Sequence, residues 1–229
     1  MTNALLDVDA LREDLTRRFR TTTRVDRIAE RAVTLLSPAN ADDLISEDDY
    51  VMDERLPYWA DLWPSARVLA NELAIMRLRG LRVLELGCGL GAPSIAAAMA
   101  GAEVTATDYY EDALLFARLN VAAATGRTIA TRLVDWTAMP PDLGKFDVVL
   151  ASDVLYEHRY ASLVADAIAA TLVRGGEAVV ADPGRIALEE FREECRDRGL
   201  VSEGESHAYV DGEIRQTITL WRIRWGTEL

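Results

Sequence analysis

A run of glycines between an apolar strand and a helix of small residues is the part of this sequence best suited to chemistry. Residues 83–91 read Val-Leu-Glu-Leu-Gly-Cys-Gly-Leu-Gly, so the strand ends in a carboxylate and alternating glycines. A second apolar strand ends at Asp108, twenty-one positions after Gly87. In a doubly wound sheet, such glycines let the backbone approach a cofactor, and the second acid accepts hydrogen bonds from ribose hydroxyls. The spacing therefore predicts a site for a nucleoside-bearing cofactor.

The elements that must hold this site follow from residue 81 onward as alternating short strands and helices. We expect strands over residues 82–87, 103–108, 129–135, 146–153 and 177–181, and helices over 65–79, 93–100, 111–125, 160–173 and 187–198. The first strands are nearly continuous apolar runs, as in a parallel sheet covered on both faces. Residues 201–225 contain Asp211-Gly212 between two strand-like runs, which predicts an antiparallel terminal hairpin. The predicted fold class is α/β, with a doubly wound, Rossmann-like sheet of seven strands.

The residues before this core are interpreted as a helical extension and a loop. Apolar residues at helical spacing between Leu5 and Leu36, interrupted by three threonines at 21–23, predict two helices packed on the core. Residues 37–54 are polar and acidic and could form a loop that covers a site. We therefore expect N-terminal helices and a loop over residues 1–55 and the main domain over residues 56–229.

Composition limits the partners and the setting. The chain has 229 residues, half of them apolar, which fits one large domain or a domain with an appendage. Its 25 basic and 38 acidic residues give a net charge of −13, which disfavours nucleic acid and anionic lipid and suits a basic protein partner. Two cysteines, no long apolar run and no signal-peptide pattern predict a reduced, cytoplasmic protein without a membrane span. The oligomeric state stays open.

Two cofactors fit the glycine run. Residues 87–92 also satisfy the dinucleotide spacing Gly-x-Gly-x-x-Ala. However, Glu85 would repel a pyrophosphate and attract the α-ammonium of S-adenosylmethionine. The terminal hairpin favours the same cofactor, because among doubly wound folds this ending is characteristic of the methyltransferases that use it. We therefore expect S-adenosylmethionine, with S-adenosylhomocysteine as product, while a solvated Glu85 and a helix-capping Asp108 stay open as structural alternatives.

An acid and an indole follow the third predicted strand. Asp135 could accept a hydrogen bond from an adenine amino group while Trp136 packs on the ring, although Trp136 could also be a core residue. His158 and His207 are the only histidines, so no metal site is predicted. Cys88 is interpreted as a small residue within the glycine loop.

Three segments resemble a known family. Residues 84–91 resemble the first motif of class I methyltransferases. Residues 57–66, Pro-Tyr-Trp-Ala-Asp-Leu-Trp-Pro-Ser-Ala, and residues 152–156, Ser-Asp-Val-Leu-Tyr, are similar to motifs of the seven-strand protein lysine methyltransferases. This branch includes bacterial relatives of the enzyme that methylates the electron-transfer flavoprotein β-subunit. The resemblance covers roughly residues 56–183 and implies methyl transfer from S-adenosylmethionine to a protein lysine.

The resemblance also implies roles for the residues that match. One group would bind the cofactor, through its methionine part, its ribose, its adenine and the pocket under the methyl donor. These residues are Trp63, Glu85, Gly87, Gly89, Asp108, Tyr109, Asp135, Trp136 and Ser152. Asp153 and Tyr156 match the family's Asp-x-x-Tyr motif, which faces the substrate lysine, and are the catalytic candidates.

The chemistry of Asp153 favours docking over proton abstraction. A lysine must lose its proton from a reference pKa near ~10.4 before it can attack, and a nearby carboxylate raises that pKa. Tyr58, Trp59, Trp63 and Tyr156 could wall the acceptor channel, because aromatic ring faces attract a cation. The alternatives are a small-molecule N- or O-methyltransferase, a cofactor-binding scaffold without turnover, and a remote NAD-dependent oxidoreductase.

Overall fold

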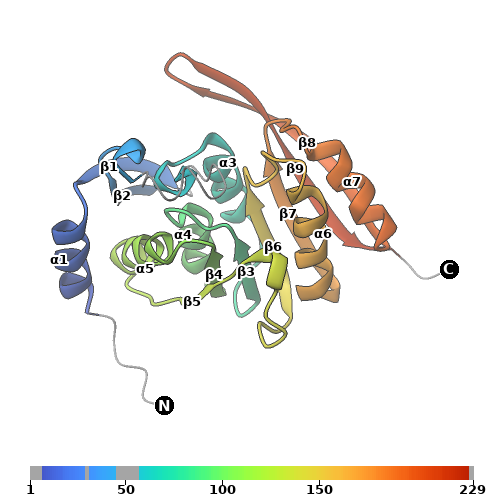
Figure 1. The fold of residues 1–229 in the computed structure, drawn as a ribbon, viewed down its shortest axis with the longest axis horizontal. Helices are drawn as coiled ribbons and strands as arrows, with labels where there is room; N and C mark the ends of the chain where they lie inside the picture. Colours follow the sequence, from blue (N-terminus) through green and yellow to red (C-terminus); the bar gives the residue numbers. More distant parts are fainter. Residues whose placement is uncertain (1–6, 29–30, 45–56, 227–229) are drawn as a thin grey trace.

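A sheet of seven strands forms the centre of the molecule in the computed structural model, which describes residues 7–28, 31–44 and 57–226 (Figure 1). The strand order is β5-β4-β3-β6-β7-β9-β8. The bounds are β3 Arg82–Leu86, β4 Glu103–Asp108, β5 Ala130–Leu133, β6 Phe146–Ser152, β7 Leu172–Asp182, β8 Leu200–Asp211 and β9 Ile214–Trp225. Strands β3 to β7 pair in parallel, whereas β9 pairs antiparallel with both β7 and β8. The predicted doubly wound sheet with an antiparallel terminal hairpin is confirmed.

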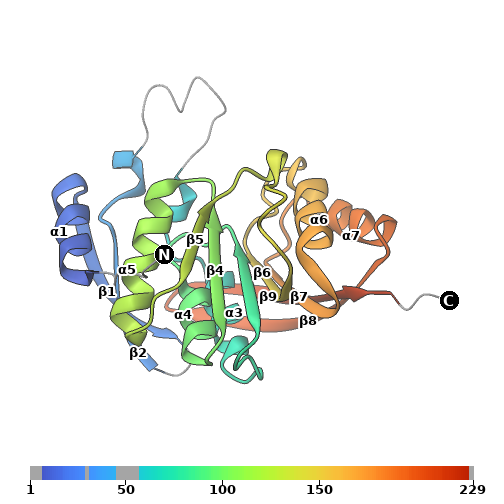
Figure 2. The same ribbon diagram turned by 90° about the horizontal axis from the view of Figure 1, so that it is seen from below.

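Helices cover both faces of the sheet (Figures 1 and 2). They are α3 Pro64–Leu73, α4 Ala92–Met99 and α5 Glu111–Thr125 on one face, and α6 Tyr160–Thr171 and α7 Leu188–Asp197 on the other. Successive side chains of a strand point to opposite faces. Accordingly, Val83 joins the core cluster under the first group of helices, whereas Leu84 and Leu86 join the cluster under the second. Both faces of the central strands are therefore buried, as their apolar sequences predict.

The order of the strands fixes where a ligand can bind. The chain runs outward from β3 to β4 and β5 on one side and returns to β6 and β7 on the other. Open α/β sheets bind ligands outside the carboxyl ends of the strands at such a reversal. The glycine run leaves β3 there, and Asp108 and Ser152 are the last residues of β4 and β6. The sheet thus brings together the residues singled out from the sequence.

The described part of the N-terminal extension contains helix α1 and a hairpin. Helix α1 spans Val8–Arg18, and strands β1 Thr21–Ile28 and β2 Arg31–Pro38 pair antiparallel. The expected second helix is therefore wrong. β-branched residues, which favour strands, are frequent over residues 21–34, and the apolar spacing there fits either structure. The hairpin packs on the main core through Ile28 and Leu35, both fully buried.

The remaining boundaries agree with the predictions to within a few residues, with two exceptions. Helix α3 ends at Leu73 rather than near residue 79, and β7 begins at Leu172, directly after α6. Short 3-10 turns occupy η1 Ala41–Leu44, η2 Tyr58–Ala60 and η3 Trp136–Ala138. Residues 45–54 of the predicted covering loop lie outside the described residues. Within the described ranges, no helix is both long and apolar enough to cross a bilayer.

Candidate active site

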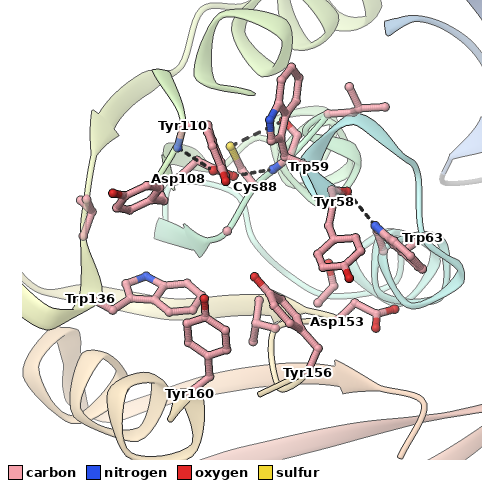
Figure 3. A pocket seen from close by; sticks show the side chains of 18 of the residues that line it. Tyr58, Trp59, Trp63, Cys88, Asp108, Tyr110, Trp136, Asp153, Tyr156 and Tyr160 are labelled. Atoms are coloured by element: carbon pink, nitrogen blue, oxygen red, sulfur yellow. Dashed lines mark hydrogen bonds between the residues drawn. The ribbon is translucent and has the colours of Figure 1, made fainter. Parts of the chain in front are cut away.

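A pocket lies at the carboxyl edge of β3, β4 and β6 (Figure 3). Its wall comes from the glycine run, the ends of β4 and β6, η3 and the aromatic segment before α3. The pocket contains all but one of the residues predicted for the site: Trp63, Gly87, Gly89, Asp108, Tyr109, Asp135, Trp136, Ser152, Asp153 and Tyr156. Only Glu85 is missing from this set. Residues distant in sequence therefore line one pocket.

The glycine run needs glycine for both conformation and space. Gly87 and Gly89 have φ angles of 68° and 49°, in the left-handed region that side chains rarely adopt. A Cβ on Gly87 would lie 3.2 Å from Val154 Cγ1, and one on Gly89 would lie 3.1 Å from the carbonyl oxygen of Trp59. Because these two residues have no side chain, the backbone of the loop is open to the pocket. A side chain at either position would obstruct the approach of a ligand to this backbone.

Asp108 joins the second strand to the glycine run. Its carboxylate accepts hydrogen bonds from the backbone N–H of Gly89 at 2.9 Å and of Tyr110 at 3.0 Å. Burial raises the pKa of Asp108, although these backbone hydrogen bonds oppose the shift. Tyr110 is the residue before α5, so Asp108 also supports the start of that helix while lining the pocket. Tyr109, which follows it, is partly exposed at the same wall.

Glu85 departs from the prediction. Its side chain points, like that of Val83, to the face of the sheet covered by α4, where it accepts a hydrogen bond from the hydroxyl of Ser94. It is 1% exposed, and burial raises its pKa to about 8. The structure does not bring this carboxylate to the pocket, because strand alternation sends it beneath the loop. The alternative of a solvated acid is therefore wrong, and the lining of the pocket gives no support to the expected contact with the methionine ammonium.

The acid and indole after β5 form the opposite wall. The carboxylate of Asp135 accepts hydrogen bonds from the backbone N–H of Thr137 at 2.8 Å and from its hydroxyl at 2.7 Å. These bonds fix the short η3 turn that carries Trp136. The Trp136 indole is half-buried and meets Tyr160 edge-on, with ring centroids 5.6 Å apart. It lines the pocket rather than being a closed core residue.

Asp153 has an unusual backbone and a charged partner. Its φ of 59° is the only positive value among the non-glycine residues of the described chain. The backbone N–H of Asp153 donates to the carbonyl of Ala181 at 3.0 Å, which ties the ends of β6 and β7 together. Its carboxylate accepts a hydrogen bond of 2.6 Å from Nε of Arg185. Left-handed backbone costs energy in most side-chain-bearing residues and is often found at functional sites.

An aromatic row extends from Asp153 across the pocket (Figure 3). Neighbouring ring centroids lie 4.9–5.9 Å apart along the series Trp63, Tyr58, Tyr156, Tyr160 and Trp136. Trp59 does not face this row, because its ring packs into the core on Phe116 at 5.6 Å. Tyr160 was not predicted. Its position four residues after Tyr156, at the start of α6, was the available signal.

The thiol of Cys88 and the imidazole of His158 do not serve as a nucleophile or a base in the pocket. Burial raises the pKa of the Cys88 thiol well above its usual value, so it stays protonated at neutral pH. His158 does not line the pocket and instead contacts Glu190 at 2.8 Å on the surface. In the described ranges, no group of three histidine, cysteine or acidic residues has the geometry to hold a metal ion.

Comparison with known proteins gives a family match over the pocket. A sequence model described as "Lysine methyltransferase" matches residues 58–185. This range begins at the aromatic segment and ends at the residue that contacts Asp153. It therefore contains every described residue of the aromatic row and the glycine run.

Several curated relatives carry related names. The chain is 32% identical over 133 residues to the electron transfer flavoprotein beta subunit lysine methyltransferase of Xenopus laevis, covering 56% of this chain and 53% of that protein. It is 36% identical over 164 residues to protein N-lysine methyltransferase METTL21A of Danio rerio, covering 66% of this chain and 72% of that protein. The chain thus spans about half the length of the flavoprotein methyltransferases it matches.

Solved structures agree in fold. A magnesium protoporphyrin IX methyltransferase from Synechocystis, solved with bound S-adenosylmethionine, superposes with a TM-score of 0.58 at 22% identity. The match covers 81% of this chain and 98% of that one. A ribosomal protein L11 methylase from Lactobacillus delbrueckii gives a TM-score of 0.55 at 22% identity, covering 70% of this chain and 78% of that one. These similarities confirm the methyltransferase fold.

Proposed function

The chain belongs to the lysine methyltransferase family, and from that membership we propose that it transfers a methyl group from S-adenosylmethionine to a lysine side chain of a protein. One observation carries the proposal. The Asp153 carboxylate and the open glycine backbone, which lie on different strands, line the same pocket. A docking group for a cation and a site for a nucleoside are thereby within one cavity, as transfer between two bound molecules requires.

The pocket fits the proposed cofactor. Gly87 and Gly89 would lie along its methionine part, Asp108 would accept hydrogen bonds from the ribose, and Trp136 would pack on the adenine. Trp63, Tyr109, Asp135 and Ser152, which line the same pocket, would complete the contacts. S-Adenosylmethionine supplies an electrophilic methyl group on a sulfonium sulfur. Since Glu85 does not reach the pocket, the choice of this cofactor over NAD rests on the family and the fold.

The acceptor residues bind and orient the lysine. The carboxylate of Asp153 attracts the ammonium and so concentrates it in the pocket, but the same charge opposes loss of the proton. Tyr156 does not act as a base, because burial and its neighbour Tyr160 raise the pKa of its phenol. The proton therefore passes to water, and the ring faces of Tyr58 and Tyr156 hold the acceptor in line with the methyl group.

The overall charge of the chain supports a protein acceptor that carries positive charge. The net charge of −13 favours encounter with a basic partner. Cys88 and Cys195 are free thiols, which supports a reducing, cytoplasmic setting. We further propose that residues 1–55 form an appendage and that residues 56–229 form the methyltransferase domain, since the family match begins at residue 58.

Labelling of a cell extract tests this function. The purified protein is incubated with radiolabelled S-adenosylmethionine and extract, and calorimetry measures its affinity for S-adenosylhomocysteine. We expect a labelled protein band that disappears with Asp153→Asn while the affinity for S-adenosylhomocysteine is retained. Asp142→Asn is the matched control, since Asp142 also pairs with an arginine but lies outside the pocket. Label in the low-mass fraction would instead indicate a small-molecule acceptor, and binding without any transfer would indicate a scaffold.

A further inference from the structure

Arg185 forms an ion pair with Asp153, the carboxylate proposed to receive the substrate cation. Nε of Arg185 lies 2.6 Å from Oδ1 of Asp153. The same guanidinium lies over the Trp63 ring, 5.4 Å from its centroid. The Asp153 side chain is 5% exposed and that of Arg185 is 34% exposed. The carboxylate at the acceptor end of the pocket is therefore already paired with one positive charge.

A turn after β7 fixes the position of Arg185. The carboxylate of Asp182, the last residue of β7, accepts hydrogen bonds of 2.7 Å from the backbone N–H groups of Gly184 and Arg185. Gly184 has a φ of 93°, which suits glycine in this turn. Asp182 is fully buried, so the turn is anchored in the core rather than hanging from the surface. The hydrogen bonds of Asp182 therefore hold the turn that places the guanidinium of Arg185 beside Asp153.

The two strand ends place two carboxylates beside this one guanidinium. Asp153 follows β6 and Asp182 ends β7, and the two strands are neighbours joined at Asp153 N–H and Ala181 C=O. Burial, with a contribution from the charge of Asp153, raises the pKa of Asp182. When both carboxylates are ionised, the cluster carries a net charge of −1, which balances one ammonium ion. Without the guanidinium, the same cluster would carry −2.

That difference bears on the reaction because an excess of negative charge hinders deprotonation. Each carboxylate near an ammonium stabilises its charged form and raises its pKa. A site with two uncompensated carboxylates would bind the lysine more tightly but would hold it in the unreactive ammonium form. Of Asp153, Asp182 and Arg185, only Asp153 lines the pocket itself. The other titratable residues that line it near Asp153 are Tyr58, Asp61, Tyr156, Glu157, Arg159 and Tyr160.

On the basis of the proposed function, we propose that Arg185 is a positioning residue that limits the stabilisation of the substrate ammonium at Asp153. It orients the Asp153 carboxylate and cancels one negative charge of the Asp153–Asp182 pair. The lysine then docks with enough affinity to be aligned and still loses its proton to water. Removal of the positive charge should strengthen ammonium binding and slow methyl transfer near neutral pH.

Binding of n-butylamine, a model of the lysine side chain, tests this inference on the full-length protein. The protein is saturated with S-adenosylhomocysteine, and ligand-observed NMR measures the dissociation constant at pH 7. Arg185→Gln and Arg185→Met are expected to tighten binding by about fivefold to tenfold, because one repulsive charge within a few ångströms is removed. Arg185→Lys should behave as wild type. Structural damage would weaken binding, so a gain separates the two explanations.

The control variants separate this inference from the proposed function. Arg132→Gln removes an arginine paired with Asp142 outside the pocket and should leave n-butylamine binding unchanged. If Asp153→Asn weakens binding while neither neutral variant at Arg185 tightens it, the role of Arg185 is overturned and the docking role of Asp153 stands. If Asp153→Asn binds as wild type does, the acceptor site itself is misassigned and both proposals fall.

A kinetic measurement on the labelled acceptor gives a second readout. With Arg185→Gln, the pH profile of kcat should shift toward alkaline pH while KM falls or stays constant, and Arg185→Lys should restore the wild-type profile. An unchanged pH profile together with a raised KM would contradict the inference.

Discussion

The backbone N–H of Gly89 donates a hydrogen bond of 2.9 Å to the carboxylate of Asp108. These residues belong to the two motifs that first indicated a nucleoside site, and they lie at the ends of neighbouring strands. The bond means that the acid proposed to bind the ribose also fixes the shape of the glycine loop. The glycine loop and the acid at the end of β4 therefore form the proposed cofactor site together. A substitution in one should change the conformation or the affinity of the other.

Asp108→Asn tests this arrangement. Asparagine retains an acceptor for one backbone N–H but loses the charge that strengthens hydrogen bonds to ribose hydroxyls. A hydrogen bond to a charged group contributes about 1.5–3 kcal/mol, whereas one between neutral groups contributes about 0.5–1.5 kcal/mol. We expect the affinity for S-adenosylhomocysteine to fall by roughly tenfold or more. The melting temperature should fall only slightly, because the hydrogen bond lost by one backbone N–H is partly offset by removal of a carboxylate whose ionised form is disfavoured by burial. Calorimetry and thermal unfolding check the two parts, and undiminished affinity would remove Asp108 from the site.

Gly91→Ala should destabilise the fold through a steric clash. A Cβ on Gly91 would lie 3.0 Å from Cβ and 3.1 Å from Cα of Ala117, and its φ is 82°. Gly126, with a φ of 67° and open space around its Cβ position, is the matched control. We expect Gly126→Ala to cost about 1 kcal/mol from backbone strain alone. Gly91→Ala should cost roughly 1–3 kcal/mol more, from overpacking of α4 on α5. Urea unfolding measures both, and equal costs would contradict the packing shown here.

Glu85 should make stability depend on pH. Its pKa of about 8 in the folded protein exceeds the ordinary glutamate value of about 4.3. Between these values the folded protein holds a proton that the unfolded chain has lost, so the free energy of unfolding falls as pH rises through this window. The slope should approach ~1.4 kcal/mol per pH unit for this one group.

Glu85→Gln should remove that slope. The variant should be flatter than wild type between about pH 5 and pH 8 and more stable at the upper end. The exposed Glu103→Gln is the control and should follow the wild-type curve. Other buried acids remain in both proteins, so the difference between the two curves isolates Glu85. Parallel curves would show that Glu85 is ionised throughout this range.

Asn120 links the N-terminal hairpin to the glycine loop. Its side chain accepts from Leu36 N–H at 2.8 Å and donates to the carbonyls of Leu36 at 3.0 Å and Leu90 at 3.1 Å. Asn120→Ala would leave these buried groups unpaired, at a cost of about 2–4 kcal/mol. We expect faster hydrogen exchange in β2 and weaker binding of S-adenosylhomocysteine. Substitution of the exposed Asn71 by alanine should change neither property. If Asn120→Ala also left both properties unchanged, Asn120 would not link the hairpin to the glycine loop.

Local patterns in the sequence were sufficient for most of the fold. Residues 103–108 and 111–125 were predicted with their observed bounds, because apolar strands and capped helices carry short-range signals. The second N-terminal helix failed because Val25, Ile28 and Leu35 fit a helical spacing equally well. In the folded chain Val25 is exposed and the other two are buried, as the pairing of β1 with β2 decides.

The sequence predicted which residue types lie at which strand ends. It did not predict the direction in which each side chain points. The carboxylate of Glu85 stands at a strand end in the sequence, and only the packing of α4 shows that it bonds to Ser94 and does not line the pocket. The contact of Arg185 with Asp153 joins two loops 32 positions apart. Asn120 and Leu36 are 84 positions apart. No local pattern signals such contacts, because they depend on which strands become neighbours.

The acceptor is the central claim, and the identity of the methylated side chain tests it most directly. The band labelled by wild type and lost with Asp153→Asn would be excised and hydrolysed in acid, and its labelled amino acid identified by chromatography and mass spectrometry. We predict that the label is recovered as methylated lysine. Recovery in any other amino acid, or a label that persists with Asp153→Asn, would contradict the account.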